Sequence, residues 1–192
     1  MDNILRAFLE RQYQDALALN DASDLVTLIP LSRSHVGDLT QRSRPLAADE
    51  DPPQHYVARF ACKGPAKVNG RIVDHNDWSV GICFPDNYLR AADPATVLTW
   101  LAPMEIYHPN IRPPFVCAGK IAPGTDLVDI VYRVFDMIRM ENVTTVETDS
   151  LNPESCSWAR DKIAGGAFPI DKRPLKRRQI QLSVSSHRPE AQ

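Results

Sequence analysis

The spacing of apolar residues changes along this chain, and that change restricts the possible folds more than any other feature. In the segments 55–64 and 77–85, apolar side chains recur at every second position. In the segment 123–140 they recur at intervals of three and four residues instead. A period of two is typical of a strand with one buried face, and a period near 3.6 is typical of an amphipathic helix. The sequence therefore predicts strands followed by a helix.

Four strands are predicted. Asp24–Leu31 is short, β-branched and closed by a proline, HYVARFACKG and DWSVGICFP alternate, and Ala95–Leu101 is the fourth candidate. Short polar turns such as NGRIVDHND join them, which indicates an antiparallel meander. The residues expected in the core are Tyr56, Ala58, Phe60, Cys62, Trp78, Val80, Ile82, Phe84 and Trp100.

The first helix is predicted from Ile4 to Leu19, with Asn20 as its stop. Arg6 and Arg11 lie off its apolar stripe, so we expect both to face solvent. The stripe consists of Leu5, Leu9, Tyr13 and Leu17, flanked by Phe8 and Ala16.

A central helix and a shorter last helix are predicted beyond residue 117. Thr125 is the expected N-cap of the central helix, and the last helix begins near Asn152 with Pro153 at its first position. The central helix buries Leu127, Ile130, Val131, Val134 and Ile138. One sheet with helices on one side or at its ends is an α+β fold.

A chain of 192 residues is most simply one domain. We place that domain at residues 1–165, with a polar, proline-containing loop insertion at 32–54 and a basic, polar tail at 166–192. The net charge of −2 argues against a whole-protein nucleic-acid binder, and DKRPLKRR in the tail is interpreted as a solvated segment.

The sequence shows no metal-ligand spacing, no signal peptide and no membrane-spanning segment, and the expected compartment and cofactors follow from this. Its four cysteines show no close zinc-ligand spacing, so we expect no metal and no cofactor. The first residues mix charges into their apolar pattern, which does not fit a signal peptide, and no apolar run approaches about 20 residues. We expect a cytoplasmic protein with reduced thiols and no membrane association.

Prolines surround one cysteine in the stretch IYHPNIRPPFVCAGK, residues 106–120. Prolines break helices and are excluded from central strands, so the stretch is interpreted as a rigid, extended surface turn that presents Cys117. A buried core cysteine is the alternative at this position. Cys62, Cys83 and Cys156 are interpreted as packing residues.

Several motifs in this order resemble the ubiquitin-conjugating enzyme family. IYHPNI precedes the cysteine, CFPDNYL follows a predicted strand, APG at 122–124 precedes the central helix, and DSLNPESCSWAR opens the last helix. The chain looks closer to divergent bacterial relatives associated with antiphage ubiquitin-like conjugation operons. The pattern departs from the family in its shorter Asn110-to-Cys117 spacing and in Leu89, which follows Tyr88 where a proline is usual.

The resemblance implies a UBC-like fold and a set of site roles. Cys117 would accept the modifier as a thioester. Asn110 would donate its amide to the oxyanion, or only tie its own loop together by hydrogen bonds. Asp149 would orient an attacking lysine and help remove its proton, or serve only as an acid at a helix N-terminus. His108 is expected to be structural, and Tyr107 to pack.

The leading hypothesis is a conjugating transferase. Its partners would be a ubiquitin-like modifier, an ATP-dependent activating enzyme that docks through Arg6 and Arg11, and a protein substrate with an amine. The alternatives are a catalytically inactive binding module on the same fold, and a cysteine hydrolase using Cys117 and His108. A hydrolase would need an oxyanion nest beside the thiol, and no glycine-rich turn lies there.

Overall fold

The computed structural model describes residues 2–31 and 50–175, so most of the predicted insertion and the end of the predicted tail lie outside the described residues. No helix in these two ranges combines the length and the apolar character needed to cross a bilayer. The elements in chain order are α1 (Asn3–Ala22), β1 (Val26–Leu31), β2 (His55–Phe60), β3 (Gly64–Val68), β4 (Arg71–His75), β5 (Trp78–Cys83), α2 (Pro94–Val97), β6 (Leu98–Ala102), β7 (Ile111–Arg112), β8 (Phe115–Val116), α3 (Leu127–Ile138), the 3-10 turn η1 (Glu147–Asp149) and α4 (Pro153–Ala164).

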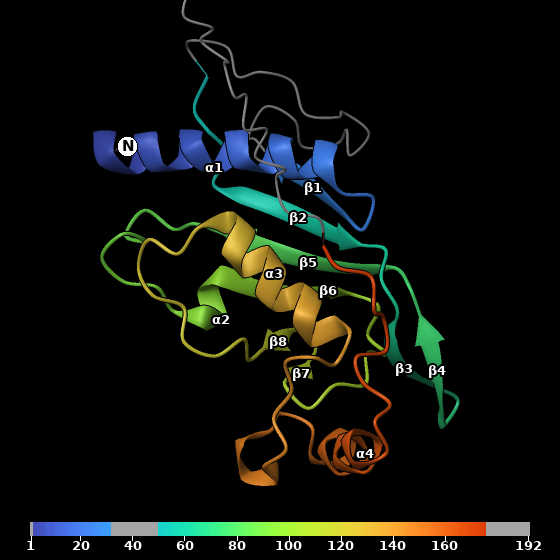
Figure 1. The fold of residues 1–192 in the computed structure, drawn as a ribbon. Helices are drawn as coiled ribbons and strands as arrows, with labels where there is room; N and C mark the ends of the chain where they lie inside the picture. Colours follow the sequence, from blue (N-terminus) through green and yellow to red (C-terminus); the bar gives the residue numbers. More distant parts are fainter. Residues whose placement is uncertain (1, 32–49, 176–192) are drawn as a thin grey trace, which may run out of the picture.

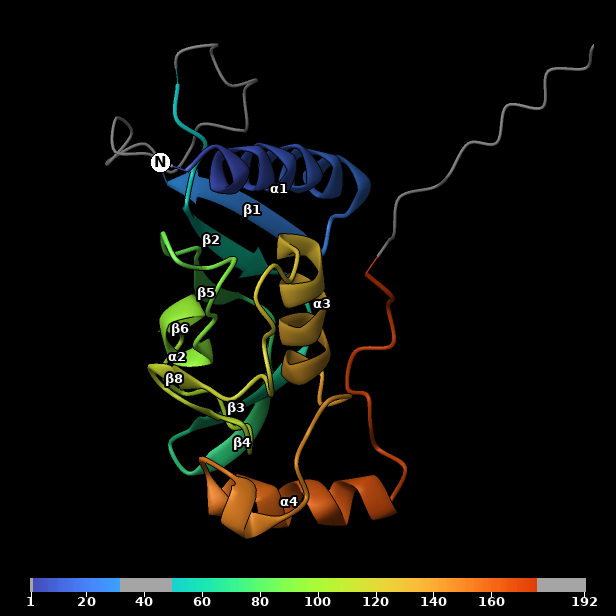
Figure 2. The same ribbon diagram turned by 90° about the vertical axis from the view of Figure 1, so that its left-hand side faces the viewer.

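The main sheet has four antiparallel strands in the order β1-β2-β5-β6, as the alternating segments predict. Phe60 lies opposite Trp78 and Ala58 opposite Val80, so both strands turn their large side chains to the same face. All nine residues predicted for the core are buried. Figures 1 and 2 show α1 along the β1 end of the sheet, α3 across one face, and α4 at the opposite end of the molecule from α1.

The fourth strand begins later than predicted. Residues 95–97, which the sequence assigned to a strand, belong to the helical turn Pro94–Val97, and β6 starts at Leu98. Asp93 precedes this turn and its carboxylate accepts the N–H of Ala95 at 3.0 Å, while Pro94 occupies the first helical position. A cap followed by a proline favours a helix start, and this local signal outweighs the β-branched residues that follow it.

The segment NGRIVDHND was predicted as a plain turn and instead contains β4. Strands β3 and β4 form a separate two-stranded hairpin. Asn69 and Gly70 close it with φ angles of 50° and 75°. Positive φ at both central residues is typical of the type I′ turn that joins paired strands.

The first helix extends to Ala22, so the prediction that Asn20 stops it is wrong. The side chain of Asn20 accepts the N–H of Leu28 at 2.7 Å and donates to the carbonyl of Leu28 at 2.9 Å. Asn20 therefore connects α1 to β1. Helix α3 also differs by one residue, because Asp126 and not Thr125 is its N-cap.

Helix α1 supplies the polar partner that the start of α3 needs. Gln12 is fully buried, accepts the N–H of Leu127 at 2.7 Å and donates to the carboxylate of Asp126 at 3.1 Å. The first backbone N–H groups of a helix lack partners within the helix, and Gln12 satisfies one of them from another element. This contact fixes the two helices relative to each other.

The chain beyond α4 folds back onto the body of the protein. Ile170 donates its N–H to the carbonyl of Arg139 at 2.9 Å, and the Tyr132 hydroxyl donates to the carbonyl of Leu175 at 2.9 Å. Asp171, the first residue of the DKRPLKRR run, is only 4% exposed. Contacts with the body of the protein thus extend to Asp171 and Leu175, whereas Lys172, Arg173 and Pro174 between them are exposed.

Candidate functional site

Cys117 lies at the end of the small hairpin made by β7 and β8. Its backbone N–H donates to the carbonyl of Asn110 at 2.8 Å, which closes the loop between the two residues. The carbonyl of Pro114 accepts the N–H of Trp100 at 2.8 Å, so β6 holds the hairpin from its other side. The stretch is therefore a paired hairpin anchored to the sheet, where the sequence predicted an extended turn.

Alternation along β8 determines which side chains reach the surface. Val116 and Ala118 are buried at 6% and 5% exposure, while Phe115 is 61% exposed and Cys117 is exposed. Successive residues of an extended strand point to opposite faces. Phe115 and Cys117 consequently share the outer side, and the predicted exposure of Cys117 is confirmed.

The other three cysteines have different surroundings. Cys62 and Cys156 are fully buried, and Cys83 is half-buried at the end of β5. Burial raises the pKa of the Cys62 thiol to about 12 and also raises the pKa of Cys83. A thiol reacts through its thiolate, so both groups are poor nucleophiles near neutral pH.

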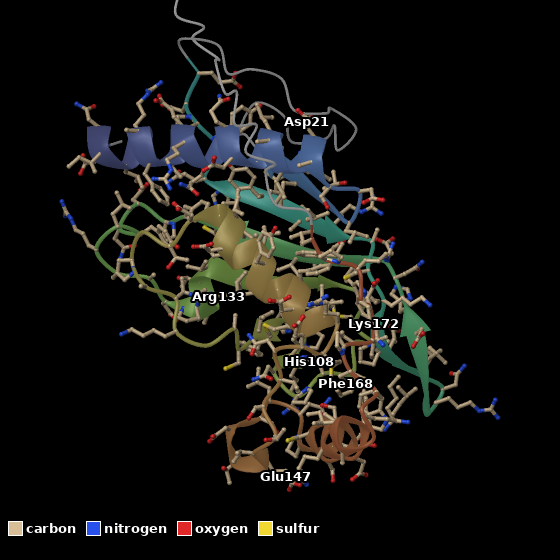
Figure 3. The ribbon with its side chains drawn as sticks, in the orientation of Figure 1. Asp21, His108, Arg133, Glu147, Phe168 and Lys172 are labelled. Atoms are coloured by element: carbon tan, nitrogen blue, oxygen red, sulfur yellow. The ribbon has the colours of Figure 1, made fainter. Side chains whose placement is uncertain are left out.

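His108 is buried and neutral. Its Nδ1 accepts the N–H of Asn110 at 3.0 Å, and burial lowers the pKa of the imidazole to about 3. His108, labelled in Figure 3, is 0% exposed, whereas Cys117 is exposed. The expected structural role fits this arrangement, because the ring shapes the turn that carries Asn110.

The side chain of Asn110 is held by its oxygen. Its Oδ1 accepts the N–H of Thr144 at 2.8 Å, which links the cysteine hairpin to the segment before α4. Its amide NH₂ donates to no other residue among 2–31 and 50–175. The oxygen of Asn110 thus ties the cysteine hairpin to a segment 34 residues away and not to its own loop, and its amide NH₂ remains available as a donor.

Asp149 lies in η1, beside the same turn. The N–H groups of Leu151 and Asn152 both donate to the carbonyl of Pro109, at 2.8 and 3.1 Å. Cys117 donates to the next carbonyl in the chain, that of Asn110. The segments that carry Asp149 and Cys117 are thus bonded to two successive carbonyls, those of Pro109 and Asn110. The Asp149 side chain is exposed, and no cationic group from the described part of the chain pairs with it.

Two residues of α4 contact this segment. The sequence indicated only a packing role for Cys156 and did not single out Arg160. The Arg160 guanidinium forms an ion pair with Glu147 and donates to the carbonyl of Thr145 at 3.2 Å. The Cys156 thiol donates to the carbonyl of Thr144 at 3.5 Å. The spacing of four between Cys156 and Arg160 was the available signal, since it places both on one face of a helix.

Arg6 and Arg11, the predicted docking residues, both have partners within the protein. Arg6 pairs with Glu10 and Asp51 and is 35% exposed, and Arg11 pairs with Asp126 at 2.6 Å and is 63% exposed. The expectation that these side chains face solvent is confirmed for Arg11 and holds in part for the half-buried Arg6.

Within the residues that the structure describes, no three His, Cys, Asp or Glu side chains gather in a way that could hold a metal ion. Neither a protein-family model nor a curated protein matches the chain.

Proposed function

We propose that this protein is a conjugating transferase of the ubiquitin-conjugating type, with a UBC-like fold. It accepts a ubiquitin-like modifier on Cys117 from an ATP-dependent activating enzyme and transfers it to an amine of a protein substrate. The arrangement of an N-terminal helix, a four-stranded antiparallel sheet, a cysteine hairpin and a helix across the sheet supports this fold. The motif resemblance described above supports the family.

One observation carries the proposal. The exposed Cys117 is bonded through its N–H to Asn110, whose side-chain oxygen is committed to Thr144 and whose amide NH₂ has no partner among the described residues. An acyl carrier needs an accessible thiol and a donor for the developing oxyanion. An exposed thiol and an amide NH₂ without a described partner, both on one short hairpin, support this proposal.

The reaction would proceed in two balanced exchanges at Cys117. In loading, the thiolate attacks the thioester carbonyl of the modifier, a new C–S bond forms, and the thiol of the activating enzyme leaves. In transfer, an amine attacks the Cys117 thioester, the C–N bond forms, the C–S bond breaks and Cys117 departs as the thiolate. The amine proton passes to a base, for which the unpaired carboxylate of Asp149 is the candidate.

The state of His108 argues against the hydrolase alternative. A cysteine hydrolase needs a base in contact with its nucleophile. His108 is buried, and its Nδ1 is occupied by the N–H of Asn110. A carrier avoids such a base, because an activated water would hydrolyse the thioester.

The proposal is tested by incubating the protein with its cognate activating enzyme, a ubiquitin-like protein and ATP. Intact mass should rise by one modifier, and a thiol reductant should remove it. Cys117→Ala should abolish loading, whereas Cys117→Ser should give an oxyester that resists thiols.

The remaining cysteines provide the matched controls. Cys62→Ala, Cys83→Ala and Cys156→Ala should each retain loading as long as they fold. Loading that persists in Cys117→Ala would refute the assignment of the acceptor. A wild-type protein that binds the modifier without forming any covalent bond would favour the inactive binding module.

A further inference from the structure

We propose that Arg160 is a positioning residue that holds Asp149 beside Cys117, and that helix α4 is therefore part of the transfer machinery. This inference rests on the proposed function. It assigns a role in that function to Arg160, although helix α4 carries none of the proposed reacting groups.

Arg160 bonds two successive parts of the segment that leads to Asp149. One guanidinium nitrogen donates to the carbonyl of Thr145 at 3.2 Å, and the other pairs with the carboxylate of Glu147 at the start of η1. That same nitrogen also donates to Ser157 on α4 at 3.3 Å. A planar guanidinium with several fixed donors can hold a backbone group and a carboxylate at once, which a lysine cannot do in the same way.

Thr144, which precedes these contacts, is held from both sides. Its N–H donates to Oδ1 of Asn110 at 2.8 Å, and its carbonyl accepts the thiol of Cys156 at 3.5 Å. The segment 144–149 is thus connected at one end to the cysteine hairpin and along its length to α4. The carbonyl of Pro109 anchors the residues that follow it. A segment secured at three places gives its side chains a defined position.

The two carboxylates of η1, those of Glu147 and Asp149, have different partners. Glu147 is neutralised by Arg160, and Figure 3 shows it at the outer edge beside α4. Asp149 has no cationic partner among the described residues, and its side chain accepts a hydrogen bond from the Thr148 hydroxyl at 3.5 Å. Because Arg160 is paired with Glu147, Glu147 is less available to bind an incoming lysine ammonium group. Asp149 remains available to bind it.

A lysine side chain has an ordinary pKa of about 10.4, so it arrives protonated and must lose a proton to attack the thioester. A carboxylate acts as a base only within hydrogen-bond reach of that proton. A displaced η1 would therefore slow the attack of lysine without changing a nucleophile that already arrives unprotonated. Hydroxylamine is such a nucleophile at neutral pH.

The test uses the full-length protein and a synthetic peptide C-terminal thioester as the acyl donor. The probe is exchanged onto Cys117 in a Cys83→Ser background, excess probe is removed, and discharge to free lysine or to hydroxylamine is followed by intact mass. Arg160→Ala should slow lysine discharge by on the order of tenfold and leave hydroxylamine discharge unchanged. Arg160→Lys should restore part of the lysine rate.

A double-mutant cycle separates positioning through Asp149 from any other effect. In an Asp149→Ala background, Arg160→Ala should cause no further loss of lysine discharge. Arg59→Ala is the matched control, because Arg59 pairs with Asp77 at 3.2 Å, both are exposed, and they lie on the main sheet and its flanking turn. It should behave as wild type with both nucleophiles.

The outcomes distinguish this inference from the proposed function. Equal slowing of lysine and hydroxylamine, or independent losses from Arg160→Ala and Asp149→Ala, would overturn the positioning role while leaving Cys117 as the carrier. A wild-type protein that forms no thioester at Cys117 would overturn the proposed function itself. If Arg160→Ala does not fold, Glu147→Gln removes the same ion pair, and unchanged lysine discharge in that variant would overturn the inference.

Discussion

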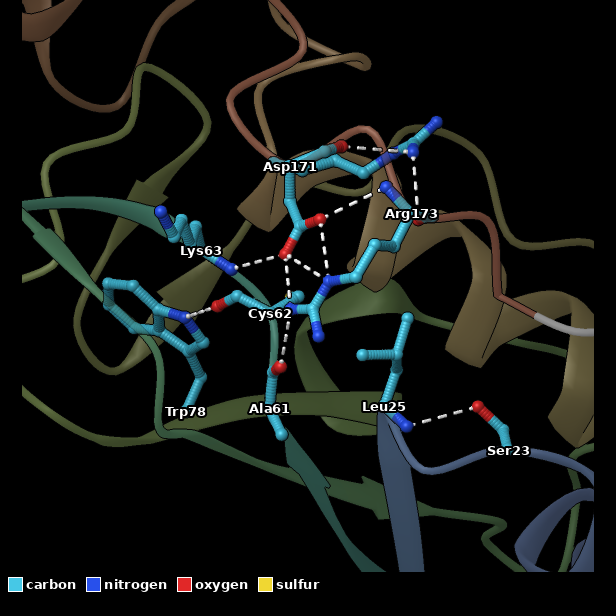
Figure 4. A network of polar contacts seen from close by, with 9 residues as sticks. Ser23, Leu25, Ala61, Cys62, Lys63, Trp78, Asp171 and Arg173 are labelled. Carbon is cyan, nitrogen blue, oxygen red and sulfur yellow. Dashed lines mark hydrogen bonds and ion pairs between the residues drawn. The ribbon is translucent and has the colours of Figure 1, made fainter.

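Replacement of Asp171 by Asn should destabilise the protein, although Asp171 lies in the chain beyond the last helix. Its carboxylate is 4% exposed and accepts the N–H of Lys63 at 2.9 Å, the N–H of Arg173 at 3.0 Å and the Arg173 guanidinium at 2.6 Å. Figure 4 shows the carboxylate between the β2–β3 connection and Arg173, which also donates to the carbonyl of Ala61 at 3.1 Å. One side chain therefore fastens the last described segment to the sheet.

The size of the expected loss in stability depends on which hydrogen-bond partners of Asp171 can be replaced by water. The Arg173 side chain is 55% exposed, so solvent recovers most of its ion pair when the charge is removed. The two backbone donors lose a charged acceptor, and a hydrogen bond to a charged group contributes about 1.5–3 kcal/mol. Because the amide oxygen of Asn can still accept one of these donors, we expect a total loss of about 2 kcal/mol. For a chain of this size that corresponds to a fall in Tm of roughly 4–8 °C.

The loss should depend on pH in a defined direction. The hydrogen bond from the Arg173 guanidinium holds the pKa of Asp171 well below its usual range. A carboxyl whose pKa is depressed on folding contributes stability that is fully present above the unfolded pKa of about 3.9 and is lost as the pH falls toward the folded value. The difference between wild type and Asp171→Asn should therefore be constant from neutral pH to about pH 5 and shrink below about pH 4.

Urea unfolding followed by tryptophan fluorescence at pH 7 and at pH 3 measures both effects. Asp77→Asn serves as the control, because Asp77 forms an exposed pair with Arg59 and should change stability by less than about 0.5 kcal/mol. A cost below about 0.5 kcal/mol for Asp171→Asn would refute the reasoning. So would a cost that is the same at both pH values.

Two further predictions concern the proposed transfer reaction. Asn110→Asp keeps an acceptor for the N–H of Thr144 and removes the free donor, so single-turnover discharge should slow by about 10²–10³ while Tm stays near that of wild type. Asn110→Ala should lower both, and a normal discharge rate in Asn110→Asp would limit Asn110 to a structural role. Reversal of Arg6 and Arg11 to Glu should slow loading by the activating enzyme at low salt, with the effect fading as salt rises. Because Arg6 and Arg11 also pair with Asp51 and Asp126, the double variant Asp51→Asn/Asp126→Asn controls for the broken contacts, and an equal loading defect in it would contradict docking through the arginines.

Local patterns in the sequence predicted most of the main sheet and of the helices. The alternation from Trp78 to Phe84 identified a buried strand face correctly, and Pro153 after Asn152 marked the start of α4. The failures arose where one local signal competed with another. At Ala95–Leu101 the β-branched residues suggested a strand, and the cap at Asp93 decided for a helical turn first. At Asn20 a common helix stop was used as a tertiary contact to Leu28.

The candidate site could be predicted only in part. The prolines around Cys117 indicated an anchored, exposed thiol, and the structure has one. The partners of Asn110 and the role of α4 could not be obtained in this way. Asn110 and Thr144 are 34 residues apart, and nothing in either local pattern marks the other as its partner.

What the sequence determined by itself was most of the main sheet and of the longer helices, with their buried faces, because the period of apolar residues reports which side of a strand or helix avoids water. The tertiary structure alone decided which polar groups meet. Gln12 at the start of α3, Arg160 on η1 and Asp171 on the β2–β3 connection each satisfy groups from a distant segment. A hydrophobic face can be buried against any apolar surface, whereas a buried hydrogen bond needs one partner at one distance and angle. Such pairings leave no periodic trace in the sequence, so only the folded chain reveals them.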